Sequence, residues 1–337
     1  MDTLRRRLER ELGTRYQIER ELSGGGMSRV FLARETALHR RVVIKVLPPE
    51  MTASLSVERF NLEITLAATL QHPHIVPLLS AGEVDGMPYF TMPFVEGESL
   101  RARIVHARDI PTAELARILR EVASALDYAH STGVVHRDIK PDNVLLSHGS
   151  AMVTDFGVAR ALSASATPGT GRITGLGISL GTPAYMSPEQ AAADPNIDNR
   201  SDIYAWGVMA YEMFSGATPF AGHTPQAMLA AQVSEPVPPL RFLRPVKNAA
   251  LGALIARCLA KDPNDRPQSA AELIGSLDAV IAPRQSHAQT QVADGLPQKR
   301  WPLVVVAVVL LLAVTAFVVR KRYTPPASGP VATPAVR

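Results

Sequence analysis

The order of apolar and polar positions divides the chain into a β-rich part and a helical part. Residues 16–95 consist mainly of short strand-like runs, most clearly from Arg41 to Leu47, with one stretch of helical spacing from Ser56 to Leu70. From Pro111 onward, apolar residues recur three or four positions apart. The clearest such face consists of Leu115, Ile118, Leu119, Val122, Leu126 and Ala129. We therefore expect an α+β chain with a small β-rich lobe at residues 16–95 and a larger helical lobe at residues 96–281.

Capping residues predict the ends of two helices in the second part. Ser201 can cap a helix that ends near Gly216, because a serine hydroxyl accepts a free N–H at a helix start and glycine adopts the left-handed conformation at a helix end. Ser269 and Glu272 have the spacing of a capping box, in which each side chain accepts the other residue's N–H.

A run without charged residues extends from Leu303 to Val319. As a helix it would be about 26 Å long, slightly less than a bilayer core of about 30 Å, and Trp301 with the flanking Lys and Arg residues can make up the difference. A buried helix or strand is the alternative, which the many valines favour. We expect a single transmembrane helix at residues 301–320 in contact with the lipid bilayer, because no sequence that could bury the run follows it.

The segments before and between these parts have the composition of surface chain. Residues 1–15 are rich in charge, lack the apolar stretch of a signal peptide and are expected to form an N-terminal extension. Residues 282–300, which include Gly295 and Pro297, indicate a flexible juxtamembrane linker. Residues 321–337 form a short tail, too small to fold alone, that we expect outside the cytoplasm.

Charge and cysteine content exclude several classes of protein. The net charge is +4, but Lys299, Arg300, Arg320, Lys321 and Arg322 flank the apolar run. Removing these five from the 35 Lys and Arg residues leaves 30 against 31 Asp and Glu, so the body is nearly neutral and we expect no nucleic-acid partner. The single cysteine, Cys258, excludes an intrachain disulfide, and its helical pattern favours a buried apolar side chain over a reactive thiol.

The residues from His136 to Asn143, His-Arg-Asp-Ile-Lys-Pro-Asp-Asn, bring together groups used in phosphoryl transfer. Asp138 is the candidate base for an acceptor hydroxyl. Asn143 and Asp155, the latter in an Asp-Phe-Gly sequence, supply the oxygen ligands that Mg²⁺ prefers. The alternative is turn capping, since Asp and Asn are frequent in turns, but the ordered set favours catalysis.

A lysine and a glycine-rich segment complete the predicted nucleotide site. Lys45 lies within an apolar strand-like run, where a buried charge needs a partner, and Glu63 on the following helix can supply it. The alternative is a purely structural ion pair. The segment that could lay backbone N–H groups over phosphates, or form an ordinary hairpin, contains Leu22, Ser23, Gly24, Gly25, Gly26, Met27, Ser28 and Val30.

Together these motifs resemble the eukaryotic-like (Hanks-type) Ser/Thr protein kinases, including the membrane-anchored prokaryotic branch. The resemblance covers about Tyr16 to Ile281 and implies a bilobal protein-kinase fold with ATP and Mg²⁺ in the cleft. It implies that Lys45 contacts the α- and β-phosphates and Lys140 the γ-phosphate. It also implies that Thr182 bonds Asp138 and Lys140, that Glu189 pairs with Arg266, and that Asp202 anchors the catalytic loop.

The resemblance also assigns the adenine pocket. Met92 aligns with the gatekeeper position, and Pro93 stands where the family commonly has Glu. Proline has no N–H, but the family uses the carbonyl at that position and both backbone groups at Val95, so recognition should tolerate it. Val43 and Leu145 complete the pocket.

Regulation by phosphorylation is expected beside Asp138. Arg137 places a guanidinium that we expect to be unpaired where a phosphate could bind it, and Thr174 best resembles the family's autophosphorylation site, with Thr182 nearby. Phosphorylation between copies would suit a homodimer.

The sequence thus predicts a Ser/Thr protein kinase that acts on protein substrates, with a single-pass anchor in the cell membrane and its kinase domain in the cytoplasm, where ATP is. A pseudokinase scaffold, which the serines at positions 23 and 28 would favour, and a metabolite kinase are the alternatives.

Overall fold

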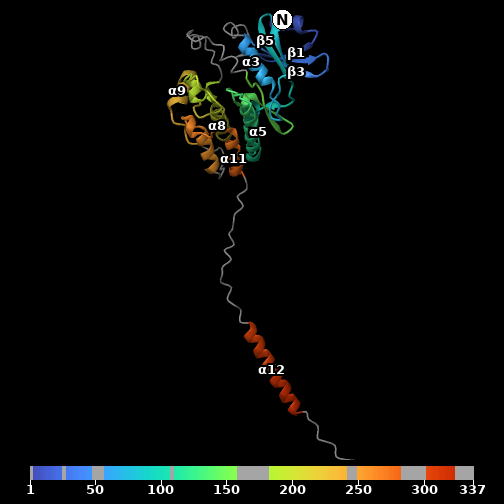
Figure 1. The fold of residues 1–337 in the computed structure, drawn as a ribbon, viewed down its shortest axis with the longest axis vertical. Coiled ribbons are helices and arrows are strands. Elements are labelled where there is room, and N and C mark those ends of the chain that lie inside the picture. Colours follow the sequence, from blue (N-terminus) through green and yellow to red (C-terminus); the bar gives the residue numbers. More distant parts are fainter. Residues whose placement is uncertain are drawn as a thin grey trace, which may run out of the picture. The chain divides into compact units, whose positions relative to one another are not determined.

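The structure is a computed structural model that describes residues 3–24, 28–47, 57–106, 110–157, 182–240, 249–281 and 301–322. The chain divides into two compact units, Met1–Ala282 and Pro283–Arg337. In the first unit, a β-rich lobe (blue and cyan in Figure 1) is followed by a helical lobe (green to orange), in agreement with the expected α+β class.

The small lobe is built on an antiparallel sheet in the order β1-β2-β3-β5-β4. Its strands are β1 (Tyr16–Gly24), β2 (Arg29–Glu35), β3 (Arg41–Val46), β4 (Ser80–Val84) and β5 (Met87–Pro93). In β3, Val42, Ile44 and Val46 are buried while the residues between them are more exposed, which is the alternation of a strand with one covered face. This strand lies in the middle of the sheet, so Lys45 is held at a fixed position.

The helix α1 (Thr3–Leu12) belongs to this lobe. Leu8 and Leu12 are buried in one cluster with Phe31 and Ile44 of the sheet. Residues 1–15 therefore include a helix packed on the core of the lobe, although their charge suggested a simple extension.

The helix α3 (Val57–Ala68) carries Glu63 on its buried side. Its Ile64 packs with Leu47, Phe90 and Met92 in a second cluster of the small lobe. The predicted helix from Ser56 to Leu70 is thus present, and its buried face lies toward the strands that carry the candidate nucleotide residues.

The helical lobe surrounds a long buried helix, α8 (Arg200–Ser215), which contacts α5 (Thr112–Ser131) and α10 (Ala249–Cys258). Trp206 is fully buried and donates its indole N–H to the carbonyl of Leu119 at 2.9 Å, which joins α8 to α5. Cys258 is buried as expected. The other elements are α4 (Leu100–His106), α7 (Pro188–Ala191), α9 (Pro225–Ser234), α11 (Ala270–Ile281), and a sheet of β6 (Glu98–Ser99), β7 (Val144–Ser147) and β8 (Ser150–Val153).

The helix ends correct two capping predictions. Helix α8 begins at Arg200, so Ser201 lies inside it and donates its hydroxyl to the Asp198 carbonyl, while the Asp198 carboxylate accepts the Arg200 N–H. The Ser201 cap was wrong, because the helix begins earlier, at Arg200, and its N-cap residue is Asn199. Gly216 ends the helix at φ +81°, as predicted.

The predicted capping box at α11 is only half present. The Ser269 hydroxyl accepts the Glu272 N–H at 3.1 Å, but the Glu272 carboxylate accepts the N–H of Gln268 rather than that of Ser269. A complete box occurs instead at the start of α7, between Ser187 and Gln190.

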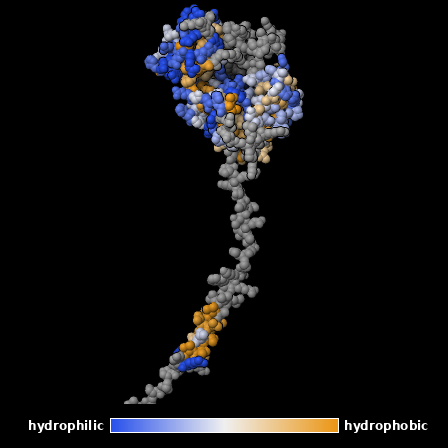
Figure 2. All heavy atoms as spheres, turned by 180° about the vertical axis from the view of Figure 1, so that it is seen from behind, coloured by the Kyte–Doolittle hydropathy of each residue, from blue (hydrophilic) through white to orange (hydrophobic). Residues whose placement is uncertain are grey.

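The second unit contains the helix α12 (Trp301–Arg322). Its described side chains from Val308 to Val319 are exposed and mostly apolar, and they form an orange stretch in Figure 2. Among the residues that the structure describes, no helix is both long enough and apolar enough to cross a membrane. The expected span at residues 301–320 is therefore not confirmed.

Candidate active site

The loop from His136 to Asn143 follows α5 and brings three predicted residues together. Lys140 Nζ lies 2.7 Å from Asp138 Oδ2. The Asn143 amide donates to the Asp138 carbonyl at 2.8 Å and to Asp138 Oδ2 at 3.1 Å. The Asp138 carboxylate is thus held in one orientation by a cation and an amide, and both Asn143 bonds use N–H groups, which leaves its amide oxygen to bind a cation.

This loop is anchored by Asp202, an acidic residue in the first turn of α8. Asp202 is fully buried and accepts the backbone N–H groups of His136 at 2.8 Å and Arg137 at 2.7 Å, together with the His130 imidazole at 2.8 Å. Burial by itself would raise the pKa of Asp202, but the His130 hydrogen bond, the nearby imidazoles and the His136 N–H lower it overall. The carboxylate therefore stays ionised and fixes the loop, as the sequence predicted.

Asp155 follows β8 near the same loop, because the N–H of the preceding residue, Thr154, donates to the Asn143 carbonyl at 2.9 Å. The Asp155 Oδ2 lies 2.5 Å from Lys45 Nζ, and its Oδ1 is buried without a hydrogen-bond partner among the described residues. A buried carboxylate oxygen in that state is costly unless a cation binds there. Asp155 and Asn143 thus fit a Mg²⁺ that takes its remaining ligands from phosphate and water. The described residues contain no group of three or more His, Cys, Asp or Glu side chains that could hold a metal alone.

Lys45 is paired with Asp155, whereas the sequence paired it with Glu63. The Lys45–Glu63 ion pair stays a prediction. Glu63 is nevertheless close to the site, because the Gly157 backbone lies against it. Gly157 has φ +77°, and a Cβ there would come within 3.0 Å of the Ala67 Cβ and 3.3 Å of the Glu63 carbonyl. Glycine therefore allows α3 to approach the Asp155 turn.

The residues predicted to enclose adenine pack together and come from both lobes. Val43 and Met92 are cross-strand partners on β3 and β5, and both belong to one cluster with Val95 and Leu145. The Thr154 hydroxyl donates to Met92 Sδ at 3.3 Å, which fixes the side chain at the gatekeeper position. Met152, the partner of Leu145 on β8, joins the cluster although the sequence analysis did not select it.

The hinge and the glycine-rich segment are described in part. Pro93 ends β5, and the next N–H, that of Phe94, donates to the Arg41 carbonyl at 3.3 Å. Ser23 pairs with Val30 across β1 and β2, which places Leu22 and Ser28 near the same turn. Gly25, Gly26 and Met27 lie outside the described residues.

The segment from Thr182 to Glu189 is attached to the helical lobe. Arg266 is 0% exposed and donates to both carboxylate oxygens of Glu189, at 2.7 and 2.8 Å, so this predicted pair is confirmed. Thr182 is exposed. Asp138 and Lys140 both lie in the described part of the chain, and neither forms a hydrogen bond with the Thr182 side chain. Lys140 bonds Asp138 directly, so the expected Thr182 bridge is absent here.

A partly buried network that the sequence analysis missed joins this segment to the catalytic loop. Arg101 of α4 donates to Glu212 of α8 at 2.6 Å, to Asp142 at 3.3 Å, and to the Tyr185 hydroxyl, which itself donates to Glu212. Burial, with the Glu212 charge, raises the pKa of Tyr185, so the phenol stays protonated and can donate. No motif could reveal these residues, because they come from four distant parts of the chain.

The predicted regulatory residues are only partly described. The Arg137 guanidinium, expected to be unpaired, donates to the Ile197 carbonyl at 3.3 Å. Thr174, like the rest of residues 158–181, lies outside the described residues.

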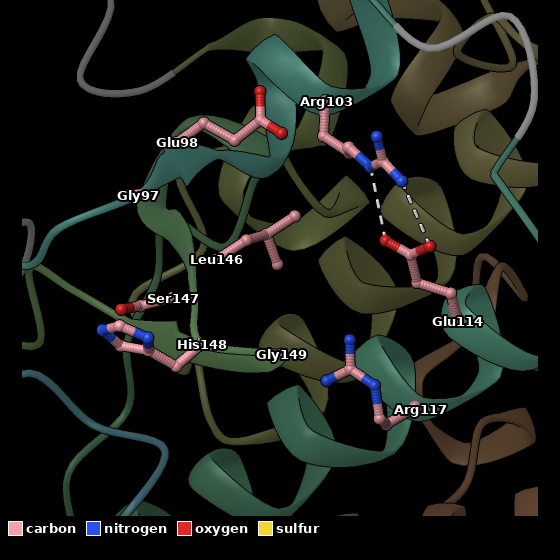
Figure 3. A pocket seen from close by; sticks show the side chains of 9 residues that line it. All are labelled: Gly97, Glu98, Arg103, Glu114, Arg117, Leu146, Ser147, His148 and Gly149. Atoms are coloured by element: carbon pink, nitrogen blue, oxygen red, sulfur yellow. Dashed lines mark hydrogen bonds and ion pairs between the residues drawn. The ribbon is translucent and has the colours of Figure 1, made fainter.

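A pocket of about 430 Å³ lies elsewhere on the helical lobe (Figure 3). It is lined by Gly97, Glu98, Arg103, Glu114, Arg117, Leu146, Ser147, His148 and Gly149. Arg103 and Glu114 form an ion pair at 3.2 Å on its wall. None of the lining residues is a predicted site residue, so this pocket is separate from the cluster around Asp138.

Comparison with known proteins agrees with this geometry. Residues 16–276 match the model of the protein kinase domain. The chain belongs to this family. Its kinase domain is 40% identical over 275 residues to the serine/threonine-protein kinase PknB of Mycolicibacterium smegmatis, which covers 79% of this chain and 43% of that protein.

Two further relatives place the kinase domain in the bacterial branch. The PknB of Mycobacterium leprae is 36% identical over 290 residues (84% of this chain, 46% of the relative), and the serine/threonine-protein kinase pkn2 of Myxococcus xanthus is 37% identical over 275 residues (80% and 32%). The resemblance to Hanks-type Ser/Thr kinases is thereby confirmed. The chain spans less than half the length of these relatives.

Proposed function

We propose that this chain is a Ser/Thr protein kinase that transfers the γ-phosphoryl group of MgATP to hydroxyl groups of proteins. The observation that carries the proposal is the meeting of Asp138, Lys140 and Asn143 with the buried, unpartnered Oδ1 of Asp155 in one kinase-family domain. A pseudokinase would be expected to lack one of these groups, and none is missing.

Each residue has a role that follows from its position. The oriented Asp138 carboxylate would accept the proton of the acceptor hydroxyl, and the ammonium of Lys140, 2.7 Å away, would offset charge on the transferred group. Asn143 and Asp155 would hold Mg²⁺, which neutralises phosphate charge when bound. Lys45 would bind the α- and β-phosphates, while Val43, Met92, Val95 and Leu145 would enclose adenine.

A transfer assay with the full chain tests this proposal. We expect labelled phosphate to pass from MgATP to a generic basic protein, and Asp138→Asn to lower that rate about 10²- to 10⁴-fold while ATP binding stays unchanged. Asp278→Asn is a matched control, because Asp278 pairs with Arg120 on the exposed surface of α11. ATP binding without transfer by the wild type would refute the enzyme and favour a scaffold.

We further propose that autophosphorylation at Thr174 activates the kinase. The support is Arg137, which precedes Asp138 in the chain and donates to the Ile197 carbonyl, because a phosphate can bind arginine bidentately. A variant with Ala at Thr167, Thr170, Thr174 and Ser179 should lose both self-labelling and the rise in activity that preincubation with ATP produces. Full activity of that variant would contradict the proposal.

Membrane anchoring through residues 301–320 is also proposed, with the kinase domain on the cytoplasmic side and a possible homodimer for phosphorylation between copies. The support is the uncharged run from Leu303 to Val319 and its basic flanks. The full chain should float with phospholipid vesicles in alkaline carbonate, and a chain ending at Ala282 should not. Equal behaviour of the two chains would exclude the anchor.

A further inference from the structure

Gln232, near the end of α9, is a buried polar residue that none of the sequence motifs includes. Its side chain is 0% exposed. The amide nitrogen donates to the Ala184 carbonyl at 2.9 Å and to the Pro183 carbonyl at 3.2 Å, and the amide oxygen accepts the Tyr204 hydroxyl at 2.6 Å. The nitrogen and the oxygen of this amide both form hydrogen bonds inside the protein, and the two bonds from the nitrogen reach the segment at Pro183 and Ala184.

The segment that Gln232 holds is also hydrogen-bonded to the catalytic loop. Pro183 and Ala184 follow Thr182 and begin the short 3-10 helix Pro183–Tyr185. Farther along, Gln190 donates to the Arg137 carbonyl at 2.7 Å, and Tyr185 is joined through Arg101 to Asp142. The backbone from Thr182 to Gln190 is therefore tied on one side to the catalytic loop that carries Asp138 and on the other side to α9.

The end of α9 that carries Gln232 is itself fixed. Lys261 donates to the carbonyls of Gln232 at 2.7 Å and Ala231 at 3.1 Å, which satisfies carbonyls left free at the helix end. Its ammonium lies 4.8 Å from the ring centre of Phe220 and 5.9 Å from that of Tyr204. Gln232 thus links a helix end that Lys261 holds in place to the backbone at Pro183 and Ala184.

We infer that Gln232 is a positioning residue for the protein acceptor: it fixes the backbone on which the acceptor chain binds, and touches neither ATP nor the reacting atoms. This inference rests on the proposed kinase activity. Glu189 and Arg266 fix the far end of the same segment, so loss of Gln232 should loosen its beginning, next to Thr182, and leave the nucleotide site unchanged.

The test compares Gln232→Met with wild type in the full chain. Methionine has a similar length and volume but cannot donate to the two carbonyls. We expect the KM for a peptide acceptor to rise about tenfold, because two buried carbonyls lose their hydrogen-bond donor. The KM for ATP, and the rate of the slow MgATP hydrolysis that occurs without acceptor, should stay within about twofold of wild type. Gln226→Met is the matched control, because Gln226 is exposed on the same helix.

A second variant separates positioning from folding. Tyr204→Phe removes the hydroxyl that orients the Gln232 amide but keeps the ring beside Lys261 and Arg266, so we expect the same shift in acceptor KM at smaller size. An unchanged acceptor KM in both variants, or an equal loss of acceptor transfer and of MgATP hydrolysis, would overturn the inference. Wild-type chain that transfers no phosphate would instead overturn the proposed function itself.

Discussion

Asp138 and Asp155 each have a lysine at hydrogen-bonding distance, although they lie on different segments. Lys140 is 2.7 Å from one carboxylate and Lys45 is 2.5 Å from the other. Two negative groups in one site repel each other, and each lysine offsets that repulsion by placing a positive charge beside one carboxylate.

A different charged pair, Glu189 with Arg266, gives a prediction for single residues. Arg266 is fully buried, so Glu189→Gln leaves its charge without a counterion, and we expect the free energy of unfolding to fall by about 3–5 kcal/mol. Glu272→Gln is the matched control: Glu272 pairs with Arg257 on the surface, and its loss should cost less than about 1 kcal/mol. Urea unfolding monitored by circular dichroism measures both values, and equal losses would contradict the argument.

The predicted residues that the structure brings together are mostly those whose partners lie close along the chain or in a recurring motif. Asp138, Lys140 and Asn143 belong to one loop, and their contacts follow from its local geometry. Arg101 and Gln232 were missed, because an Arg or Gln in a helix has no local feature that indicates burial. Only the packing of α4, α8 and α9 around the Thr182–Glu189 segment brings them to their partners.

At the scale of elements, the many charged residues of α1 obscured the apolar spacing that determines how it packs. Leu4, Leu8 and Leu12 are spaced four apart, which is the pattern of a helix with one apolar face. The arginines and glutamates between them are more conspicuous and suggested a surface extension. The buried Leu8 and Leu12 show that the apolar spacing decided how the segment packs. Ser201 is the converse case, since its cap prediction missed that the helix begins earlier, at Arg200.

The contribution of α1 can be measured with a pair of identical substitutions. Leu8→Ala removes a fully buried side chain and should lower the free energy of unfolding by about 2–5 kcal/mol. Leu38→Ala, at a position 63% exposed, should change it by no more than about 0.5 kcal/mol. The comparison requires thermal or urea unfolding of both variants; a loss below about 1 kcal/mol for Leu8→Ala would mean that the helix does not stabilise the lobe.

For the whole molecule, each lobe has an apolar core of its own, and a further apolar cluster packs Met92 of the small lobe with Leu145 of the helical lobe. Periodicity predicted these two parts, because each core comes from residues near in sequence. It could not assign the three-stranded sheet of β6, β7 and β8, because its two-residue strand β6 is too short to show alternation.

The stability of the first unit should depend on pH through Lys261. Burial, reinforced by the nearby Arg266, lowers the pKa of Lys261 to about 8, against an ordinary value of 10.5. Between these values the unfolded chain binds more protons than the folded chain, so this residue makes stability rise with pH from about 8 to about 10.5. Between pH 7 and pH 10, the melting temperature of the wild type should rise relative to that of Lys261→Met. A constant difference between them would show that Lys261 has an ordinary pKa.

Met92 has a practical consequence for tracing what this protein acts on. Its sulfur accepts the Thr154 hydroxyl, and its side chain is buried against Ile64 and Phe90, so the proposed nucleotide pocket is closed behind it. Met92→Ala would open a hollow there, and an ATP analogue enlarged on the adenine ring could then enter. If the chain transfers phosphate as proposed, a label on the γ-phosphate of that analogue would mark the proteins that the Met92→Ala variant modifies.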